Sequence, residues 1–370
     1  MNLDFSDDDK MVRAHVARLL GAKCPISVVR SVIDGNETYA KDAWDGLVEM
    51  GLVGAHIPEA SGGAGAGYCA LCVAAEEIGA ALAPIPFVST FIVSEAVLQF
   101  GTGKQKAELL PKLSSGELIG CFASAETTCE MTADSVRTTL AGSRVNGMKL
   151  IVPFGAAADI ALVLVKEPAG PSLALVDLRD ADVLRKGVAT VDPTRASAAL
   201  TFANARGERL GDQPGEGWCQ MGKLYDSAAV LLAFEQVGGA RAALEMAVAY
   251  SKQRYAFGRP IGSFQALKHM MADMYAAWKL AESNCYYAAW ALSTRASDLG
   301  LAAATARVSA TQAYQLCARE NIQVHGGMGF TWEFDCHLHY RRANYLALEL
   351  GGLSSWEENL VRNLTAMKAS

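Results

Sequence analysis

The spacing of apolar residues changes twice along this 370-residue chain, and the order of the three spacings limits its fold more than any other feature. Up to about residue 115 the spacing is helical, with breaks such as HIPEASGGAGAGY. From about 116 to 215 it shortens to strand-like runs, among them LIGCFASAE, ADIALVLVK and SLALVDLR. After Gly217 it is helical again in three long segments: SAAVLLAFEQVGGARAALEMAVAYSKQR, FQALKHMMADMYAAWKLAESNCYYAAWAL and LAAATARVSATQAYQLCARENIQV.

These spacings predict an α+β protein with three parts. We expect an N-terminal α-helical domain over 1–115, a middle β domain over 116–216 and a C-terminal helical bundle over 217–370. A chain of 370 residues, 51% of them hydrophobic, is long enough for two or three domains and for a large core.

Composition argues against two classes of partner. Acidic residues outnumber basic ones by 39 to 33, whereas nucleic-acid binding depends on clustered Lys and Arg. No apolar run reaches the roughly 18 residues of a membrane-spanning helix, and the first ten residues, MNLDFSDDDK, are acidic where a signal peptide is basic and then apolar. We therefore expect a cytoplasmic protein that binds neither nucleic acid nor membrane.

The nine cysteines are odd in number and scattered along the chain, unlike the dense, even set of a small disulfide-bonded domain. We expect most of them to be reduced thiols in the core. Cys69 and Cys72 form a CxxC pair, but no second pair follows at the spacing of a zinc site, and their surroundings predict an amphipathic helix. We expect no metal site.

Two glycine-containing segments are candidates for ligand binding. Gln323–Phe330 lies between two helical runs, where either a ligand approaches the backbone closely or the chain simply needs a positive φ. Arg254–Gln265 joins two long helices and carries two arginines among aromatic and small residues. These arginines either hold a diphosphate or lie in a solvated loop. The presence of both segments in one chain favours the binding interpretation.

Five segments, taken in order over essentially the whole chain, resemble the acyl-CoA dehydrogenase family: GLVGAHIPEASGGAGAG, AAEEIGAALAPIP, GTGKQKAELLPKLSSGELIGCFASAE, RYAFGRPIGSFQALKH and NIQVHGGMGFTWEFDCHLHYRRA. The resemblance implies a middle β-barrel-like domain, a C-terminal four-helix bundle, bound FAD and assembly into a homo- or hetero-oligomer. It also implies that one set of residues contacts the adenosine diphosphate half of FAD, partly across a subunit interface: Arg254, Phe257, Gln265, Gln323, Gly326 and Gly327.

The reaction implied by this resemblance is the α,β-dehydrogenation of an acyl-CoA thioester to a trans-2-enoyl-CoA. A carboxylate removes the α-proton while the β-hydrogen leaves as hydride to the flavin, and the electrons pass to an electron-transfer flavoprotein. A dry pocket raises the pKa of the carboxylate towards that of its target and strengthens hydrogen bonds to the thioester carbonyl.

The position of that carboxylate is open. In one branch of the family the base lies at the start of the last helix, where an ungapped match places Leu350, and Glu349 is one residue away, about 100° on a helix. In another branch it lies on the helix before the Arg-x-x-Phe-Gly loop, where the match is Ala228. The nearby acids are Asp226, which we expect to cap a helix N-terminus, and Glu235. All three carboxylates remain candidates.

The segment expected to face the flavin ring also departs from the family pattern. Ser124 and Glu126 belong to a Ser-Ala-Glu-Thr-Thr run that replaces Thr-Glu-Pro and loses a hydroxyl, and 151–153 reads Ile-Val-Pro instead of Trp-Ile-Thr. This asymmetry resembles one subunit of the heterotetrameric acyl-CoA dehydrogenases of steroid side-chain breakdown.

Two hypotheses stay open: an enzyme that acts alone, and a catalytically deficient partner subunit. A non-catalytic or nucleic-acid-associated homologue is disfavoured by the acidic balance.

Overall fold

The computed structural model describes residues 5–128 and 131–369, so Cys129 lies outside the described residues. The chain forms two compact units. The helical unit consists of Met1–Ile26, Cys72–Ala83 and Ala229–Ser370, and the mixed unit consists of Ser27–Leu71 and Pro84–Ala228. The two units alternate along the chain, and the expected boundaries 1–115, 116–216 and 217–370 remain predictions.

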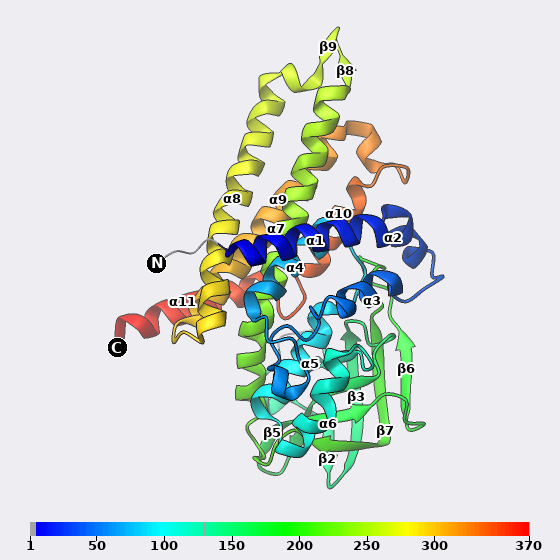
Figure 1. Cartoon of the computed structure of the whole chain (residues 1–370), viewed down its shortest axis with the longest axis vertical. Coiled ribbons are helices and arrows are strands. Elements are labelled where there is room, and N and C mark those ends of the chain that lie inside the picture. Colours follow the sequence, from blue (N-terminus) through cyan, green and yellow to red (C-terminus); the bar gives the residue numbers. More distant parts are fainter. Residues whose placement is uncertain (1–4, 129–130, 370) are drawn as a thin grey trace. The chain divides into compact units, whose positions relative to one another are not determined.

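Eleven α-helices are present in the described chain (Figure 1): α1 Asp7–Lys23, α2 Ile26–Ile33, α3 Lys41–Glu49, α4 Tyr68–Ala80, α5 Phe87–Phe100, α6 Gly103–Ser114, α7 Gly217–Gln253, α8 Gln265–Thr294, α9 Leu299–His325, α10 Cys336–Leu346 and α11 Leu353–Ala369. Short 3-10 turns are η1 Glu59–Ser61, η2 Ala133–Ser135, η3 Ile261–Ser263 and η4 Gly326–Phe330. None of the described helices is long and apolar enough to cross a membrane.

Seven strands form one mixed sheet in the mixed unit: β1 Gly120–Ala123, β2 Thr139–Ala141, β3 Arg144–Val152, β4 Ile160–Glu167, β5 Gly170–Asp177, β6 Val183–Gly187 and β7 Ala198–Arg209. The pairings run from β4 through β2, β3, β7 and β5 and return to β4, so these strands close into a barrel. Strand β4 pairs with three neighbours and is buried at six successive residues, as expected for a strand covered on both faces.

The expected fold class is confirmed. The strand-like runs of the sequence correspond to β1, β4 and β5, and the three long helical runs correspond to α7, α8 and α9. In Figure 1, α8 and α9 lie side by side in the helical unit. Strands β8 Tyr255–Ala256 and β9 Arg259–Pro260 form a small hairpin between α7 and α8.

Close helix packing places Glu235 within the helical unit. Helices α4 and α7 approach through two glycines, because a Cβ on Gly79 would lie 1.8 Å from the carbonyl oxygen of Glu235, and one on Gly238 would lie 1.8 Å from that of Glu76. Only glycine permits backbones to come this close. The two glycines therefore fix where Glu235 stands against α4.

The expectation that Asp226 caps a helix was wrong. Helix α7 begins at Gly217, nine residues earlier, so Asp226 lies inside it. The start of the helix packs against β5: a Cβ on Gly217 would come within 2.4 Å of the Ser172 backbone, and the amide of Gly215 donates to Ser172 Oγ at 2.9 Å. Helix α7 therefore begins at this contact with β5, and not at a capping side chain at position 226.

Of the eight described cysteines, six are buried: Cys24, Cys72, Cys121, Cys285, Cys317 and Cys336. These eight cysteines form no disulfide with one another. Cys69 and Cys72 lie in α4, as the sequence predicted.

Candidate functional site

The hairpin between α7 and α8 presents cationic and aromatic side chains at the surface of the helical unit. Phe257 is 93% exposed and has a φ of +55°. Arg259 lies over the ring of Phe264 at 4.1 Å. Arg254 and Gln265 are exposed, and their side chains make no hydrogen bond or ion pair with the residues that the structure describes. These groups are thus available to a ligand or to another chain.

The glycine turn after α9 offers exposed backbone. Gly326 has φ +59° and ψ −137°, a conformation that favours glycine, and nothing lies within 4 Å of a Cβ built on Gly326 or Gly327. The ring of His325 stacks on Tyr250 at 4.0 Å and anchors the preceding helix end. Gln323 is exposed on the last turn of α9. A planar or anionic group can approach this backbone without meeting a side chain.

Glu126 is engaged inside the mixed unit. Its carboxylate accepts hydrogen bonds from Lys149 Nζ at 2.7 Å and from the amides of Arg137 and Thr138 at 2.7 and 2.9 Å. Burial acts to raise the pKa of Glu126, but the bonds from Lys149 and Thr138 outweigh it and lower that pKa. Burial in turn lowers the pKa of Lys149 to about 8. Glu126 therefore ties three chain segments together.

Ser124 contacts a residue that the sequence did not single out. Its Oγ lies 2.8 Å from the hydroxyl of Tyr225 on α7, and the ring of Tyr225 packs edge-on against Phe122. Lys149 Nζ also donates to the carbonyl of Ser124 at 3.1 Å. The two residues are 101 positions apart in the sequence, so their contact was not visible there. The only sequence feature that pointed to Tyr225 was its position next to the base candidate Asp226.

Ile151 lies in a bulge of β3. The register of β3 against β7 shifts between Lys149 and Val152, and Ile151 has a φ of +46° with 44% of its surface exposed. A β-branched residue with positive φ is a genuine outlier, and such strain concentrates at ligand sites. The amide of Leu150 donates to the carbonyl of Ala125 at 2.8 Å, which joins the bulge to the run that carries Ser124.

The carboxylate of Asp226 differs from the other two base candidates because it has no partner in the part of the chain that the structure describes. It makes no hydrogen bond or ion pair with the described residues. Burial alone raises its pKa to about 6. A carboxylate in this state is able to accept a proton near neutral pH.

Glu235 forms a buried ion pair. Arg342 Nη1 donates to its Oε1 at 3.0 Å, and both side chains are 1% exposed. Arg342 also donates to the carbonyl of Leu82 at 3.1 Å. A carboxylate held in this way is oriented by its counter-ion.

Glu349 and Leu350 lie in a turn, because α10 ends at Leu346 and α11 begins only at Leu353. The helical rotation considered for Glu349 therefore does not apply. The guanidinium of Arg307 donates to the carbonyls of Leu346 and of Glu349, the latter at 2.8 Å, and Leu350 follows with a φ of +61°. Burial lowers the pKa of Arg307 to about 10, and the nearby carboxylate of Glu349 acts against this.

The candidate residues thus fall into two sets. The mixed unit brings Ser124, Glu126, Tyr225 and Asp226 into one region of bonded or adjacent residues, and the helical unit holds the hairpin, the glycine turn and both arginine-associated glutamates. Sequence reasoning missed three residues that the geometry makes important: Tyr225, Arg307 and Lys149.

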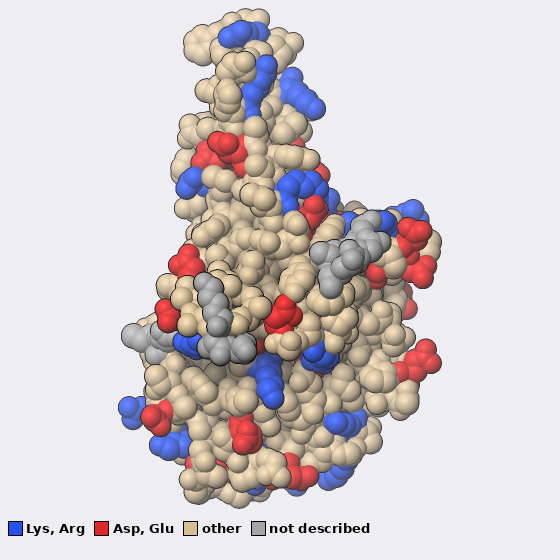
Figure 2. Space-filling view, turned by 90° about the vertical axis from the view of Figure 1, so that its left-hand side faces the viewer, with Lys and Arg blue, Asp and Glu red and all other residues tan. Residues whose placement is uncertain are grey.

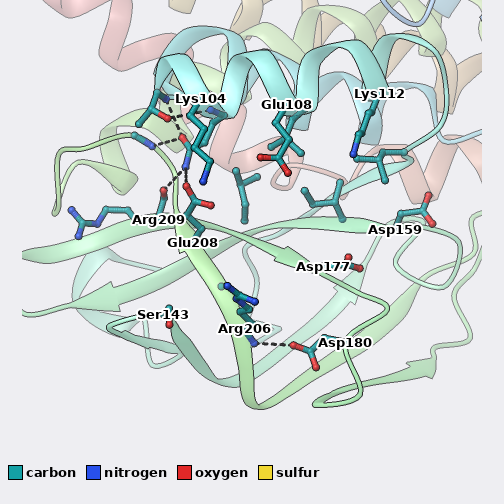
Figure 3. Close-up of a pocket in the computed structure, with 18 of the residues that line it drawn as sticks. Lys104, Glu108, Lys112, Ser143, Asp159, Asp177, Asp180, Arg206, Glu208 and Arg209 are labelled. Carbon is teal, nitrogen blue, oxygen red and sulfur yellow. Dashed lines mark hydrogen bonds between the residues drawn. The ribbon is translucent and has the colours of Figure 1, made fainter.

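A pocket of about 1090 Å³ lies elsewhere in the mixed unit, between α6 and the strands (Figure 3). Lys104, Glu108 and Lys112 extend into it from α6. Its lining carries seven acidic and five basic residues and none of the residues predicted for cofactor or base. Small-molecule sites are mostly apolar with a few convergent polar groups, so we do not place the functional site in this pocket.

On most of the face shown in Figure 2, Lys and Arg are interspersed with Asp and Glu. The described residues contain no group of three or more His, Cys, Asp or Glu that could hold a metal ion.

Comparisons with known proteins agree with the fold and with the motifs. A family model described as "Acyl-CoA dehydrogenase, N-terminal domain" matches residues 6–117, and one described as "Acyl-CoA dehydrogenase, C-terminal domain" matches 215–357. The chain is 34% identical over 343 residues to "Acyl-CoA dehydrogenase IpdE2" of Mycobacterium tuberculosis, with 91% of each chain covered.

Two solved structures are also similar. One, a variant of the "Tcur3481-Tcur3483 steroid ACAD", has a TM-score of 0.87 and 28% identity, and covers 98% of this chain and 99% of that one. Butyryl-CoA dehydrogenase from Megasphaera elsdenii has a TM-score of 0.91 at 24% identity, covering 99% of this chain and all of that one (100%), which supports the fold.

Proposed function

This chain belongs to the acyl-CoA dehydrogenase family of oxidoreductases, and from that premise we propose that it is an FAD-binding subunit that takes its catalytic carboxylate from a second, different chain. Together the two chains would convert an acyl-CoA to a trans-2-enoyl-CoA and pass the electrons to an electron-transfer flavoprotein.

The surface of the helical unit fits FAD. Arg254 and Gln265 have no internal partners among the described residues, and the glycine turn at 326–327 leaves space that any Cβ would fill. The guanidinium suits a diphosphate, and the bare backbone suits a closely approaching group. We propose that these residues hold the adenosine diphosphate half, together with Phe257 and Gln323. FAD itself supplies the hydride acceptor.

One observation carries the proposal of a second chain: the positions matched to the family's bases hold no free carboxylate. Leu350 and Ala228 stand at those positions. Glu349 lies beside Arg307 in a turn, and Glu235 is bound to Arg342 at 3.0 Å. A general base must reach the proton that it abstracts, and a carboxylate bound to a buried arginine, as Glu235 is, is less free to move.

The comparisons support the same proposal. The name "Tcur3481-Tcur3483 steroid ACAD" joins two protein names, which favours assembly with a second chain. It also favours a steroid-derived acyl group as the substrate class.

Co-expression tests the proposal. The chain is purified alone and together with an acyl-CoA dehydrogenase homologue of the same genome that carries Glu at the position of Leu350 or Ala228. We expect enoyl-CoA formation, measured with an artificial electron acceptor, only when both chains are present. Dehydrogenation by the chain alone, at a rate equal to that of the pair, would contradict the proposal.

Asp226 favours a second candidate, an enzyme that acts alone. It is the one base candidate with no partner among the described residues, and its pKa is raised to about 6. If Asp226 is the base, Asp226→Asn lowers the rate of the chain alone by roughly 10²- to 10⁴-fold. Asp273 is exposed and makes no ion pair with the described residues, so Asp273→Asn should leave the rate unchanged. An unchanged rate in Asp226→Asn removes this candidate.

A further inference from the structure

The glycine turn after α9 has little that holds it from within. No described atom lies within 4 Å of a Cβ built on Gly326 or Gly327, and glycine loses more conformational freedom on ordering than any other residue. A turn that binds a ligand closely gains affinity when it is ordered before the ligand arrives. The order of this turn must therefore come from the residues beside it.

His325, the residue directly before the two glycines, packs in an aromatic cluster. Its ring stacks on that of Tyr250 of α7, with centroids 4.0 Å apart and planes at 25°. Phe334, which follows the turn, contacts both rings at steep angles, with its centroid 5.9 Å from that of His325 and 6.1 Å from that of Tyr250. Stacked and edge-on contacts are the arrangements that aromatic rings prefer. The cluster thus joins α7 to the residues on both sides of the turn.

A hydrogen bond and a close contact fix His325 further. Its Nδ1 lies 2.8 Å from the carbonyl oxygen of Asn321, and a carbonyl oxygen only accepts, so Nδ1 carries the hydrogen. Gly329 folds back onto His325: a Cβ on Gly329 would lie 3.2 Å from the Cβ of His325 and 2.6 Å from the carbonyl oxygen of Ile322. A displacement of His325 therefore displaces the turn that packs against it.

The charge of the His325 ring depends on its burial. The residue is 5% exposed, and burial lowers its pKa below the ordinary 6.5, while the bond to Asn321 acts against this. Tyr250 is the titratable group that faces the ring from α7, Phe334 and Gly329 are uncharged, and no charged side chain of the described residues contributes to the shift.

The sign of the pH effect follows from this burial. At pH 7.5 the ring is neutral, and the charged ring forms only as the pH falls below 6.5. Because the buried ring binds a proton less tightly than an exposed histidine does, protonation favours conformations in which the ring has left the cluster.

We propose that His325 is a positioning residue: its neutral ring, packed against Tyr250 and Phe334, orders the glycine turn for its ligand, and protonation of the ring releases the turn. The inference rests on the proposed binding of FAD and deepens it, because it makes the affinity for the adenosine diphosphate half depend on pH through one residue. It concerns the helical unit alone and leaves the source of the catalytic carboxylate unchanged.

FAD titration at two pH values tests the proposal. The full chain, alone and with its second chain, is stripped of flavin and titrated with FAD at pH 7.5 and pH 5.5 while flavin fluorescence is followed. We expect the unchanged chain to bind FAD about 2-fold or more weakly at pH 5.5, because only molecules with an ordered turn bind. His325→Phe keeps a ring in the stack but cannot be protonated, so its affinity should be close to that of the unchanged chain at pH 7.5 and fall less at pH 5.5. His325→Ala removes the ring and should weaken binding several-fold at both pH values.

A second measurement needs no cofactor. Hydrogen exchange of the backbone amides at 326–330 is followed at pH 7.5 in the flavin-free chain. Exchange should be faster in His325→Ala than in the unchanged chain, and slow again in His325→Phe. Tyr250→Leu removes the stacking partner and should behave as His325→Ala does.

His15→Phe is the matched control, because His15 is exposed on α1 and makes no hydrogen bond or ion pair with the described residues. It should keep the affinity, the pH dependence and the exchange rates of the unchanged chain. Urea unfolding of every variant identifies any affinity that is lost only through a general loss of stability.

The outcomes separate the inference from the function on which it rests. If the unchanged chain binds FAD, and His325→Phe loses as much affinity at pH 5.5 as the unchanged chain or His325→Ala binds as well as it, the inference is wrong and the proposed function stands. The same holds if the variants only lose stability. If the unchanged chain binds no FAD, alone or with its second chain, the proposed function fails, and the hydrogen exchange at 326–330 still decides whether His325 orders the turn.

Discussion

Arg342 Nη1 donates to Glu235 Oε1 at 3.0 Å, and both side chains are 1% exposed. Removing one partner of such a pair leaves a buried charge without compensation. We therefore expect Glu235→Ala to lower the free energy of unfolding by about 3–5 kcal/mol, measured by chemical denaturation.

The double variant Glu235→Leu, Arg342→Met provides the control, because it removes both charges and restores apolar contacts. It should recover most of the stability. A loss below about 1 kcal/mol in the single variant would mean that Glu235 is not held as the structure shows, and would make it a free carboxylate again.

The sequence predicted elements better than side-chain partners. The long apolar periodicities located α7, α8 and α9, because a repeat near 3.6 residues is a local property of the chain. The glycine turn at 326–330 was also visible, since glycine marks a backbone conformation directly.

The state of each carboxylate was not visible. Whether Glu235 is free depends on Arg342, which is 107 positions away, and the turn at Glu349 depends on Arg307, which is 42 positions away. The partner of Ser124 is 101 positions away. Asp226 was misread as a cap because the start of α7 is set by a tertiary contact at Gly217. Local pattern carries no information on such contacts.

Arg307 fixes the turn between α10 and α11. Its Nη2 donates to the carbonyls of Leu346 and Glu349. Its Nη1 donates to Gln236 Oε1 and, at 3.2 Å, to Thr311 Oγ1. Arg307→Met leaves buried carbonyls unpaired, so we expect a loss of roughly 2–4 kcal/mol in unfolding free energy and faster proteolysis at 346–352.

Arg307→Lys is the informative comparison. An ammonium keeps the charge but lacks the planar fork that reaches two carbonyls and two side chains at once, so the lysine variant should lose an intermediate amount of stability. If the methionine and lysine variants are equally stable and the turn is equally resistant to protease, the hydrogen bonds of Arg307 do not hold the turn.

Asp226 makes stability depend on pH. Burial raises its folded-state pKa from 3.8 to about 6, so the folded chain binds a proton more tightly than the unfolded chain. The stabilisation is complete below about pH 4 and is lost as the pH rises through about 6, because the charged carboxylate is then buried without a partner among the described residues.

Asp226→Asn removes this titration. We expect it to be more stable than the unchanged chain at pH 7.5, by up to about 3 kcal/mol, and equally stable near pH 4. Denaturation at the two pH values measures both differences. A variant that is less stable at pH 7.5 would show that Asp226 has a favourable partner when ionised.

The glycine turn allows ligand binding to be tested apart from folding. Gly326 has a positive φ, so Gly326→Ala strains the backbone by about 1–3 kcal/mol as well as adding bulk. Gly327 has no positive φ, and nothing lies within 4 Å of its added Cβ, so Gly327→Ala should change the free energy of unfolding by less than about 0.5 kcal/mol.

If FAD approaches the backbone at Gly327, the methyl group that Gly327→Ala adds stands in its path, and FAD affinity should fall several-fold although the fold is intact. Gly103→Ala, at the start of α6 and likewise without neighbours within 4 Å, is the control and should leave FAD binding unchanged. Equal FAD affinity in Gly327→Ala and the unchanged chain would place the cofactor away from the turn.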